Sequence, residues 1–185
     1  MKTRNKFIQW QKKQHSQREK ISFLIIMAIF FIFVLPTGLF FISQRLDRIL
    51  NFPMVLQPPF NLVGILLLIV GWPLALWAVW VQYKVGRGTP APMMPTQKLV
   101  IVPPYNYCRN PMILGSGIWL LGFVILFNSL SFIFISIFLF IVILFYFKFV
   151  EEKELEARFG QEYVRYKKQV PFLIPVFKKK IDRTK

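Results

Sequence analysis

The stretch MILGSGIWLLGFVILFNSLSFIFISIFLFIVILFYFKFV, residues 112–150, is apolar over nearly its whole length and contains no Asp, Glu or Arg. A helix needs roughly 20 apolar residues to cross the hydrocarbon core of a membrane, so this stretch is long enough for two passes. Asn128 and Ser129 interrupt it near the middle, as expected of a tight turn between two helices. The stretch therefore predicts a helical hairpin made of residues 112–128 and 130–150.

Two more apolar stretches precede the hairpin, at residues 21–42 and 60–83. Hydrophobic residues make up 55% of the 185-residue chain, which is not the composition of a soluble globule. We therefore expect an all-α integral membrane protein with about four transmembrane helices, forming a single domain over residues 21–185. Residues 1–20 form a basic arm that we expect to lie along the membrane interface. Pro36 and Gly38 predict a kink or a packing point in the first helix.

The distribution of Lys and Arg predicts the orientation of the chain. Loops rich in these residues stay on the cytoplasmic side of a membrane. With both termini inside, all of the 24 Lys and Arg except Arg45 and Arg48 fall on the cytoplasmic face. We therefore expect an integral cell-membrane protein whose loop 84–111 and tail 151–185 are cytoplasmic. This topology accounts for the net charge of +16, so we do not infer nucleic-acid binding.

Cysteine and histidine are too few for several kinds of site. The chain has one Cys, Cys108, and one His, His15. A single Cys excludes an intrachain disulfide and a cysteine-rich metal site, and a single His argues against zinc catalysis. Cys108 has no His beside it in the sequence to activate it as a nucleophile. We predict no metal site.

The remaining polar residues are concentrated in the loop 84–111 and in the segment 151–175. The loop is rich in Pro, which prevents helix formation and stiffens the path of the chain. The segment 151–175 begins with two adjacent Glu residues. Its apolar residues recur at helical spacing, and a glycine predicts a break; these are Leu155, Phe159, Tyr163 and Tyr166, with Gly160 as the break.

These two segments can form a polar pocket on the cytoplasmic side. Such a pocket would contain Arg109 and Asn110 from the loop, aromatic side chains, and the carboxylates of Glu151 and Glu152. Together these groups suit a small polar ligand that carries both charges. From the residues alone we infer a small polar cofactor and a partner that approaches from the lipid. A solvated interfacial helix is the alternative explanation for the acidic tail.

The sequence LV…PYNYCRNPMILG, followed at the next helix end by EE…L…FG..Y..Y...VP..IP, resembles the superfamily of isoprenylcysteine carboxyl methyltransferases and phospholipid methyltransferases. The usual wording of the first motif in that superfamily is GPYRYVRHPMYLG. The resemblance covers about residues 86–175. It implies an integral-membrane, S-adenosylmethionine-dependent methyltransferase that acts on a lipidic or hydrophobic acceptor. The cofactor would sit in a cytoplasmic pocket formed by the loop, the hairpin and the tail.

The resemblance also implies a set of cofactor-binding residues. They are Gln97, Lys98, Leu99, Val100, Tyr105, Arg109, Asn110, Pro111, Met112, Ile113 and Glu151. For a ligand with an amino group, a carboxylate and a sulfonium, Glu151 or Glu152 would pair with the amino group and Arg109 with the carboxylate. Leu99, Val100 and Pro111 would enclose the adenine. Tyr105 or Tyr107 would face the sulfonium.

Methyl transfer needs alignment more than acid or base catalysis. A carboxylate acceptor is already ionised near pH 7, whereas an amine must first lose a proton. For an amine acceptor, Glu152 is the candidate base.

Three departures from the family pattern bear on the acceptor. Asn110 stands where the family usually has His, and Ile113 stands where it usually has Tyr. Phe147 stands where prenylcysteine methyltransferases carry an Arg that holds the substrate carboxylate, which argues against that substrate. A phospholipid amine, an isoprenoid-linked acid and a small hydrophobic thiol or phenol all stay open as acceptors.

Two other functions stay open at this point. Membrane reductases resemble the superfamily in the same region but use NADPH, whose phosphates require more cations than Lys98 and Arg109 supply. A non-catalytic membrane protein is the other alternative. Binding of S-adenosylmethionine, of NADPH or of neither separates the three.

Overall fold

Helices account for most of the described chain. The computed structural model describes residues 16–53 and 60–176, where it contains helices and loops but no named strand. Three helices there are long and apolar enough to span a membrane: Gln17–Leu50, Asn61–Lys84 and Leu130–Phe159. The predicted all-α membrane fold is confirmed. Most of the predicted basic arm, residues 1–15, lies outside the described residues.

The first helix is longer than the apolar stretch that predicts it. It consists of α2 (Gln17–Ile29), a π-helical turn η1 (Phe30–Val34) and α3 (Leu35–Leu50), and it begins at a capping box between Ser16 and Glu19. The π-helical turn directly precedes Pro36, which has no N–H to donate to the helix ladder. Pro36 is buried, but a Cβ at Gly38 would meet nothing within 4 Å. The packing point is therefore at Pro36 and not at Gly38.

Two antiparallel helices, α4 (Asn61–Lys84) and α5 (Pro111–Phe127), form the most extensive contact between elements. Each carries two buried glycines seven residues apart, and these face each other in two pairs. Gly71 faces Gly115, and Gly64 faces Gly122, such that a Cβ at any of the four would collide with the partner helix. Small residues let two helix backbones approach closely in a membrane, so these glycines fix how α4 and α5 pack.

The hairpin turn joins α5 to α6 (Leu130–Tyr146) at the predicted position. Asn128 ends α5 in the left-handed conformation (φ 47°), and the side chain of Ser129 accepts a hydrogen bond from the Phe132 amide. A side chain of α3 also caps α6, because Asp47 Oδ1 accepts a hydrogen bond of 2.9 Å from the Ser131 amide. The beginning of α6 is therefore tied to the end of α3.

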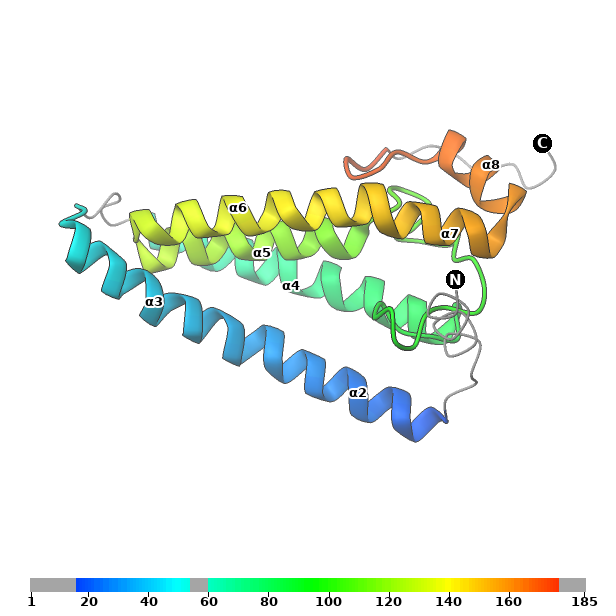
Figure 1. Ribbon diagram of the computed structural model, residues 1–185, viewed down its shortest axis with the longest axis horizontal. Coiled ribbons are helices and arrows are strands. Elements are labelled where there is room, and N and C mark those ends of the chain that lie inside the picture. Colours follow the sequence, from blue (N-terminus) through cyan, green and yellow to red (C-terminus); the bar gives the residue numbers. More distant parts are fainter. Residues whose placement is uncertain (1–15, 54–59, 177–185) are drawn as a thin grey trace, which may run out of the picture.

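The long first helix contacts the rest of the bundle mainly near its two ends. Near the hairpin turn, the rings of Phe40 and Phe127 lie 4.7 Å apart. At the opposite end, Tyr83 donates a hydrogen bond of 2.7 Å to the side chain of Gln17. α2 has no buried residue, and in Figure 1 its ribbon is set apart from the other helices.

The last transmembrane helix continues well beyond its apolar part. From α6 the chain passes through a π-helical turn η2 (Phe147–Glu151) into α7 (Glu152–Phe159). Gly160 (φ 56°, ψ −132°) ends α7 at the predicted break, and α8 (Gln161–Gln169) then turns back over the bundle end. Positive φ favours glycine, which explains the residue type at this corner.

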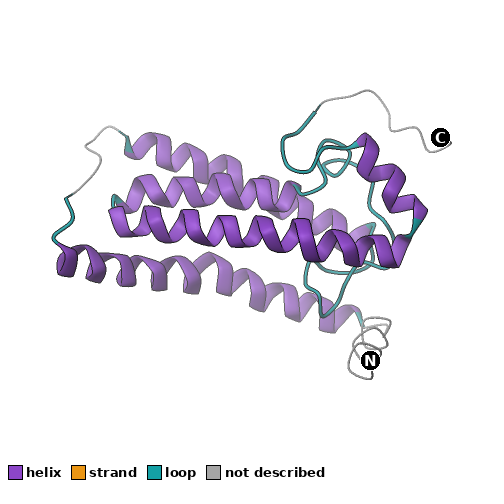
Figure 2. Cartoon of the chain, turned by 45° about the horizontal axis from the view of Figure 1, so that its top comes forward, coloured by secondary structure: helices purple, strands orange, loops and turns teal. Residues whose placement is uncertain are grey.

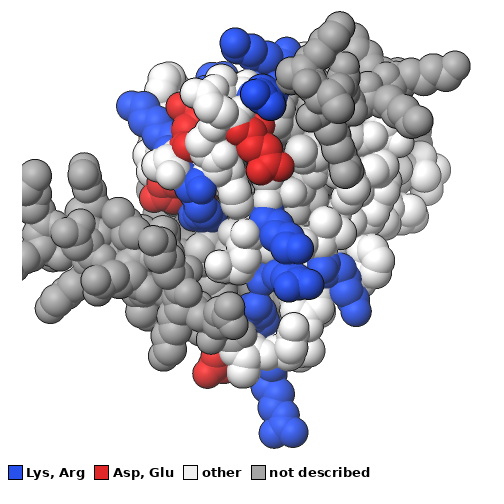
Figure 3. Space-filling model, turned by 90° about the vertical axis from the view of Figure 1, so that its right-hand side faces the viewer, with Lys and Arg blue, Asp and Glu red and all other residues white. Residues whose placement is uncertain are grey.

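Charged side chains gather at the end of the bundle that carries α7 and α8. Figure 3 looks onto this end, where Lys and Arg cover much of the described surface beside a smaller group of acids. In the described chain, only Arg45 and Arg48 among the Lys and Arg residues lie at the hairpin-turn end. The sides of the bundle expose apolar side chains such as Ile26, Leu66 and Phe138. This is the arrangement expected of a protein surrounded by lipid along its length.

Candidate functional site

The loop between α4 and α5 folds at the charged end (Figure 2), and α8 packs against its second part. Its first part is fixed by short backbone hydrogen bonds, from Thr89 to Met94 (2.6 Å) and from Gln97 to Gly86 (2.7 Å). A Cβ at Gly88 would collide with the backbone of Pro95. The predicted fixed course of this Pro-rich loop is therefore provided by close backbone contacts as well as by proline.

Two apolar clusters hold the second part of the loop in place. Val100 and Tyr105 pack with Ala78 and Val81 of α4. On the other side of the loop, Tyr163, Tyr166 and Val170 of the tail pack against a second set of apolar side chains, which are Leu99, Ile101, Leu155 and Phe159. The apolar stripe predicted for the tail thus covers the loop, and the loop is enclosed between α4 and α8.

Polar contacts also tie the tail to the loop. The Arg109 amide donates to Pro171 O (2.9 Å), and the Val176 amide donates to Tyr107 O (3.0 Å). The side chain of Asn110 donates to Phe172 O (3.0 Å), and the Tyr166 hydroxyl donates to Tyr105 O (2.6 Å). Because the tail supplies these partners, the geometry of the motif PYNYCRNP depends on the tail.

A buried ion pair lies at the centre of this end. Arg109 pairs with Glu152, and their side chains are only 7% and 4% exposed. Lys167 lies 2.9 Å from the other oxygen of Glu152 and 2.7 Å from Glu156, and Lys148 approaches Glu152 at 3.9 Å. The hydrogen bonds to Glu156 and Glu152 raise the pKa of Lys167. Charge and hydrogen bonding therefore link the loop, α7 and α8.

The two adjacent glutamates have different environments. Glu152 faces Arg109 and Lys167, whereas Glu151 is half-buried near Tyr105. Burial raises the pKa of the Tyr105 phenol well above its usual value, and the charges of neighbouring groups including Glu151 raise it further. Within the described residues, no Lys or Arg nitrogen lies within 4 Å of the Glu151 carboxylate. Glu151 therefore forms no ion pair within 4 Å in this part of the chain, and the cation whose charge acts on it there is Arg158 of α7.

Outside the atoms that form the Arg109–Glu152 ion pair, three buried polar atoms at this end of the bundle also lack a hydrogen-bond partner among the described residues. Two are acceptors, the side-chain oxygens of Gln82 and Asn106, and the third is the donor Nε of Arg109. Buried polar groups are almost always paired, because an unpaired one costs about 1–3 kcal/mol. Gln82 lies in α4 and Asn106 follows Tyr105, so both acceptors flank the same part of the loop. Unpaired groups of both kinds at one end of the bundle can provide hydrogen bonds to a polar ligand.

The predicted cofactor-binding residues occupy several different environments. Gln97 and Lys98 are exposed, whereas Tyr105 is buried in an apolar cluster and its hydroxyl donates to Ala78 O. The helix start combines buried Pro111 and Ile113 with half-buried Met112. Arg109 and Glu151 lie at the same end of the bundle, but Arg109 is paired with Glu152.

Some residues at this site carry no signal in a single sequence. Lys167 reaches Glu152 only because the chain reverses at Gly160. The ring of Phe172 lies 4.8 Å from Lys148 Nζ and 5.7 Å from the Arg109 guanidinium. The direction of a turn and the path of a tail are set by tertiary packing, so spacing along the chain does not reveal these contacts.

The fold and this site define a class of helical membrane proteins. In this class the polar groups converge at one end of the bundle, where the last helix of a transmembrane hairpin leaves the membrane. Residues 60–162 match the model of the phospholipid methyltransferase family, and they run from just before α4 to the start of α8. More than half of the chain is matched, and the protein belongs to this family of membrane methyltransferases, part of the superfamily that also contains the isoprenylcysteine carboxyl methyltransferases. No curated protein and no solved structure gives a significant match to the chain.

Proposed function

We propose that this protein transfers a methyl group from S-adenosylmethionine to a hydrophobic or lipid-linked acceptor at the membrane face where α7 and α8 lie. From the Lys and Arg distribution, we take this to be the cytoplasmic face. Membership of a methyltransferase family supports the reaction class. The cofactor assignment rests on one observation: no Lys or Arg nitrogen of the described residues lies within 4 Å of the Glu151 carboxylate.

The unpaired groups fit the chemistry of this cofactor. S-adenosylmethionine presents an amino group, hydroxyl groups and an adenine amino group as donors, a carboxylate as acceptor, and a positively charged sulfonium. Glu151 would hold the amino group, and the oxygens of Gln82 and Asn106 would accept from neutral donors. The unpaired Nε of Arg109 would donate to the carboxylate. Each unpaired group thus has a partner of the right kind on the cofactor.

The two cations among the predicted cofactor-binding residues, Lys98 and Arg109, support this cofactor over NADPH. A nucleotide with several phosphates requires a cluster of Arg or Lys side chains that are free to contact it. Here the charge of Arg109 is paired with Glu152, and Lys98 is exposed on the loop. S-adenosylmethionine, which carries one carboxylate, requires much less positive charge.

When bound, S-adenosylmethionine supplies an activated methyl group on its sulfonium. The protein then has to fix the direction of approach and exclude water, which alignment and a closed site accomplish. The tail that covers the loop, held by the bonds from Arg109 to Pro171 and from Asn110 to Phe172, is suited to both tasks.

The environment of Glu152 favours a positioning role over a base role. One carboxylate oxygen contacts Arg109 and the other contacts Lys167. A base must offer an oxygen to the proton that it removes. We therefore propose that Glu152 holds Arg109 in the orientation that leaves Nε available.

The experiment that tests this function is calorimetric titration of the detergent-solubilised protein with S-adenosylmethionine, with NADPH titrated in parallel. We expect binding of S-adenosylmethionine alone. Changing Glu151→Ala should weaken this binding at least tenfold, which corresponds to about 1.4 kcal/mol. Glu162→Ala is the matched control, because Glu162 is an exposed acid at the start of α8. Equal binding by wild type and Glu151→Ala would remove Glu151 from the site, and binding of NADPH alone would identify a reductase.

Turnover assays then separate the acceptors. One arm supplies phosphatidylethanolamine, and the other supplies a farnesylated cysteine with a free carboxylate, each with radiolabelled S-adenosylmethionine. Methylation in the first arm would identify a phospholipid amine as the acceptor, and a phospholipid is the substrate class that the family description names. Methylation in the second arm would show that the protein binds a prenylcysteine carboxylate although Phe147 stands at the position of the family Arg.

A further inference from the structure

A cavity lies at the hairpin-turn end, far from the site described above. It has a volume of about 590 Å³ and lies between the end of α3 and the turn that joins α5 to α6. Its lining residues are Phe40, Gln44, Asp47, Arg48, Asn51, Phe52, Pro53, Phe127 and Asn128. Cavities of roughly 300–1,000 Å³ commonly bind small molecules.

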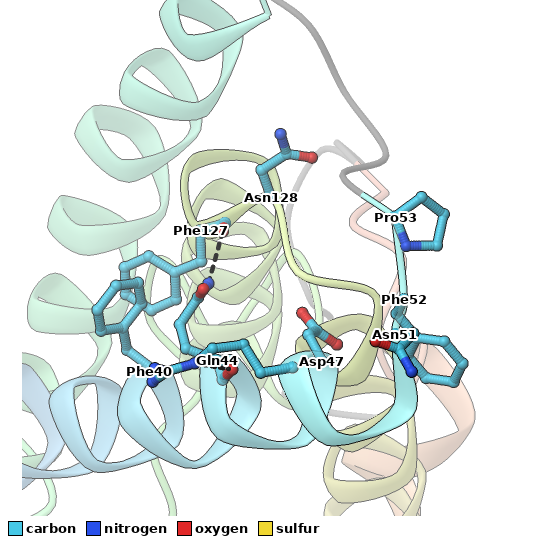
Figure 4. Close-up of a pocket in the computed structure, with 9 residues that line it drawn as sticks. Phe40, Gln44, Asp47, Asn51, Phe52, Pro53, Phe127 and Asn128 are labelled. Carbon is cyan, nitrogen blue, oxygen red and sulfur yellow. Dashed lines mark hydrogen bonds between the residues drawn. The ribbon is translucent and has the colours of Figure 1, made fainter.

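The cavity has apolar walls and a polar, charged edge. Aromatic rings from Phe40, Phe52 and Phe127 form much of its apolar lining. Gln44 and Asp47 project from α3 toward the hairpin turn (Figure 4), where Gln44 donates to Phe127 O at 3.3 Å. A ligand that is apolar at one end and polar at the other matches this lining.

The position of the cavity along the bundle indicates a lipid. The apolar helix α5 ends at the hairpin turn, and the apolar helix α6 begins there. The cavity therefore lies at the level of the boundary between hydrocarbon and headgroups. Large apolar side chains in the same part of α3 are exposed, including Phe41 (62%) and Ile49 (72%). In a membrane these side chains contact acyl chains, so a headgroup in the cavity would keep its tails in the bilayer.

The charges of the cavity select the kind of headgroup. It is lined by one acid, Asp47, and one base, Arg48. Asp47 is fixed in place because it caps α6 through the Ser131 amide. Arg48 is exposed, and its Nε donates to Gln44 O, which leaves the terminal nitrogens of the guanidinium for a phosphate. One positive and one negative group complement a zwitterion better than an anion.

We propose that this cavity binds the headgroup of a zwitterionic phospholipid of the surrounding membrane, with the phosphate at Arg48 and the ammonium at Asp47. The lipid would bridge α3 to the α5–α6 hairpin at the level where the Ser131 amide of α6 donates a hydrogen bond to Asp47 of α3. This site is separate from the proposed methyl-transfer site, so either proposal can fail without the other.

Native mass spectrometry of the full-length protein tests the proposal. The purified protein is delipidated and mixed with phosphatidylethanolamine or phosphatidylglycerol of identical acyl chains. We expect wild type to retain at least fivefold more phosphatidylethanolamine than phosphatidylglycerol. Arg48→Gln should lower the retention of both lipids at least fivefold, because it removes the contact to the phosphate that they share, whereas Arg45→Gln should preserve it, because Arg45 is also exposed in α3 but does not line the cavity. Both variants should retain wild-type S-adenosylmethionine binding.

Three results would overturn the proposal. An equal loss of lipid retention in the Arg45→Gln and Arg48→Gln variants would show a general effect of positive charge. Equal retention of the two lipids by wild type would show that the cavity does not recognise a zwitterion. Equally tight binding of glycerophosphoethanolamine, which has the same headgroup but no acyl chains, would identify a soluble ligand instead of a membrane lipid. A thermal melt of Arg48→Gln within a few degrees of wild type excludes unfolding as the cause of lost binding.

Discussion

The pair α4–α5 and the helix α2 are both apolar, but they are held in place in different ways. α4 and α5 approach each other at four buried glycines, where added Cβ atoms would collide with the partner helix. α2 has no buried residue, and side chains such as Ile25 (55%) and Ile26 (61%) are exposed. In lipid, an apolar side chain gains little by moving from the bilayer to another helix, so hydrophobicity alone does not pack helices. Shape and polar contacts decide which of them pack.

This difference coincides with the extent of the family match. The match begins at residue 60, just before α4, and α2 and α3 lie outside it. The tightly packed pair, the loop and most of the charged network lie within residues 60–162. The packed region is therefore the part that carries the family pattern, and α2 is attached to it mainly near its two ends.

The largest expected effect comes from breaking the buried ion pair of the packed region. Glu152→Gln removes the charge that faces Arg109, which is 7% exposed. Leaving one partner of a buried pair uncompensated costs about 3–5 kcal/mol. We expect a large fall in the apparent melting temperature in detergent, measured by circular dichroism. Glu162→Gln, at an exposed position, should change it little. A stable Glu152→Gln protein that binds the cofactor but has lost turnover would instead identify Glu152 as a base.

A smaller effect should follow from one methyl group at the α4–α5 contact. Gly71→Ala places a Cβ against the backbone of Gly115 and Trp119. Forcing extra volume into a close-packed contact costs about 1–3 kcal/mol. Gly38→Ala is the matched control, because its Cβ would meet nothing within 4 Å, and the higher helix propensity of Ala favours it by up to about 1 kcal/mol. The melting temperature should therefore fall in Gly71→Ala and rise in Gly38→Ala. A neutral Gly71→Ala would show that the two helices can separate without loss of stability.

The smallest effect should come from α2 itself. Ile25→Ala removes three carbons from a side chain that is 55% exposed to the membrane. Substitutions at exposed positions usually change stability by less than about 0.5 kcal/mol. We expect an unchanged melting temperature and unchanged methyl transfer in lipid nanodiscs. A drop in stability comparable to that of Gly71→Ala would mean that a protein surface covers α2 in the membrane.

Much of the fold could be predicted from the sequence because length and apolar composition are strong signals. The apolar stretch 60–83 corresponds to α4 at Asn61–Lys84, and the polar pair Asn128 and Ser129 marks the hairpin turn. The glycine spacing of seven in both α4 and α5 is also visible in the sequence. Its meaning depends on which helices are neighbours, and that is a tertiary fact.

The candidate site was less predictable, for two physical reasons. The adjacent residues Glu151 and Glu152 were expected to serve one pocket, but neighbouring helical positions point in different directions, and η2 ends between them. The ion pair of Arg109 with Glu152 joins residues that are distant in the chain. Such pairing depends on how α5, α6 and the loop meet, and residue type and spacing do not contain that information.

The bonds between the loop and the tail have a consequence for biosynthesis. The carbonyl groups of Pro171 and Phe172 and the amide of Val176 complete the hydrogen bonds of Arg109, Asn110 and Tyr107. Domains of a growing chain fold as their residues become available, and these partners are made after every described transmembrane helix. Insertion into the membrane can therefore be complete while the proposed catalytic end is still unformed. A chain truncated before Pro171 would therefore be inserted but would lack the hydrogen bonds that shape the proposed site.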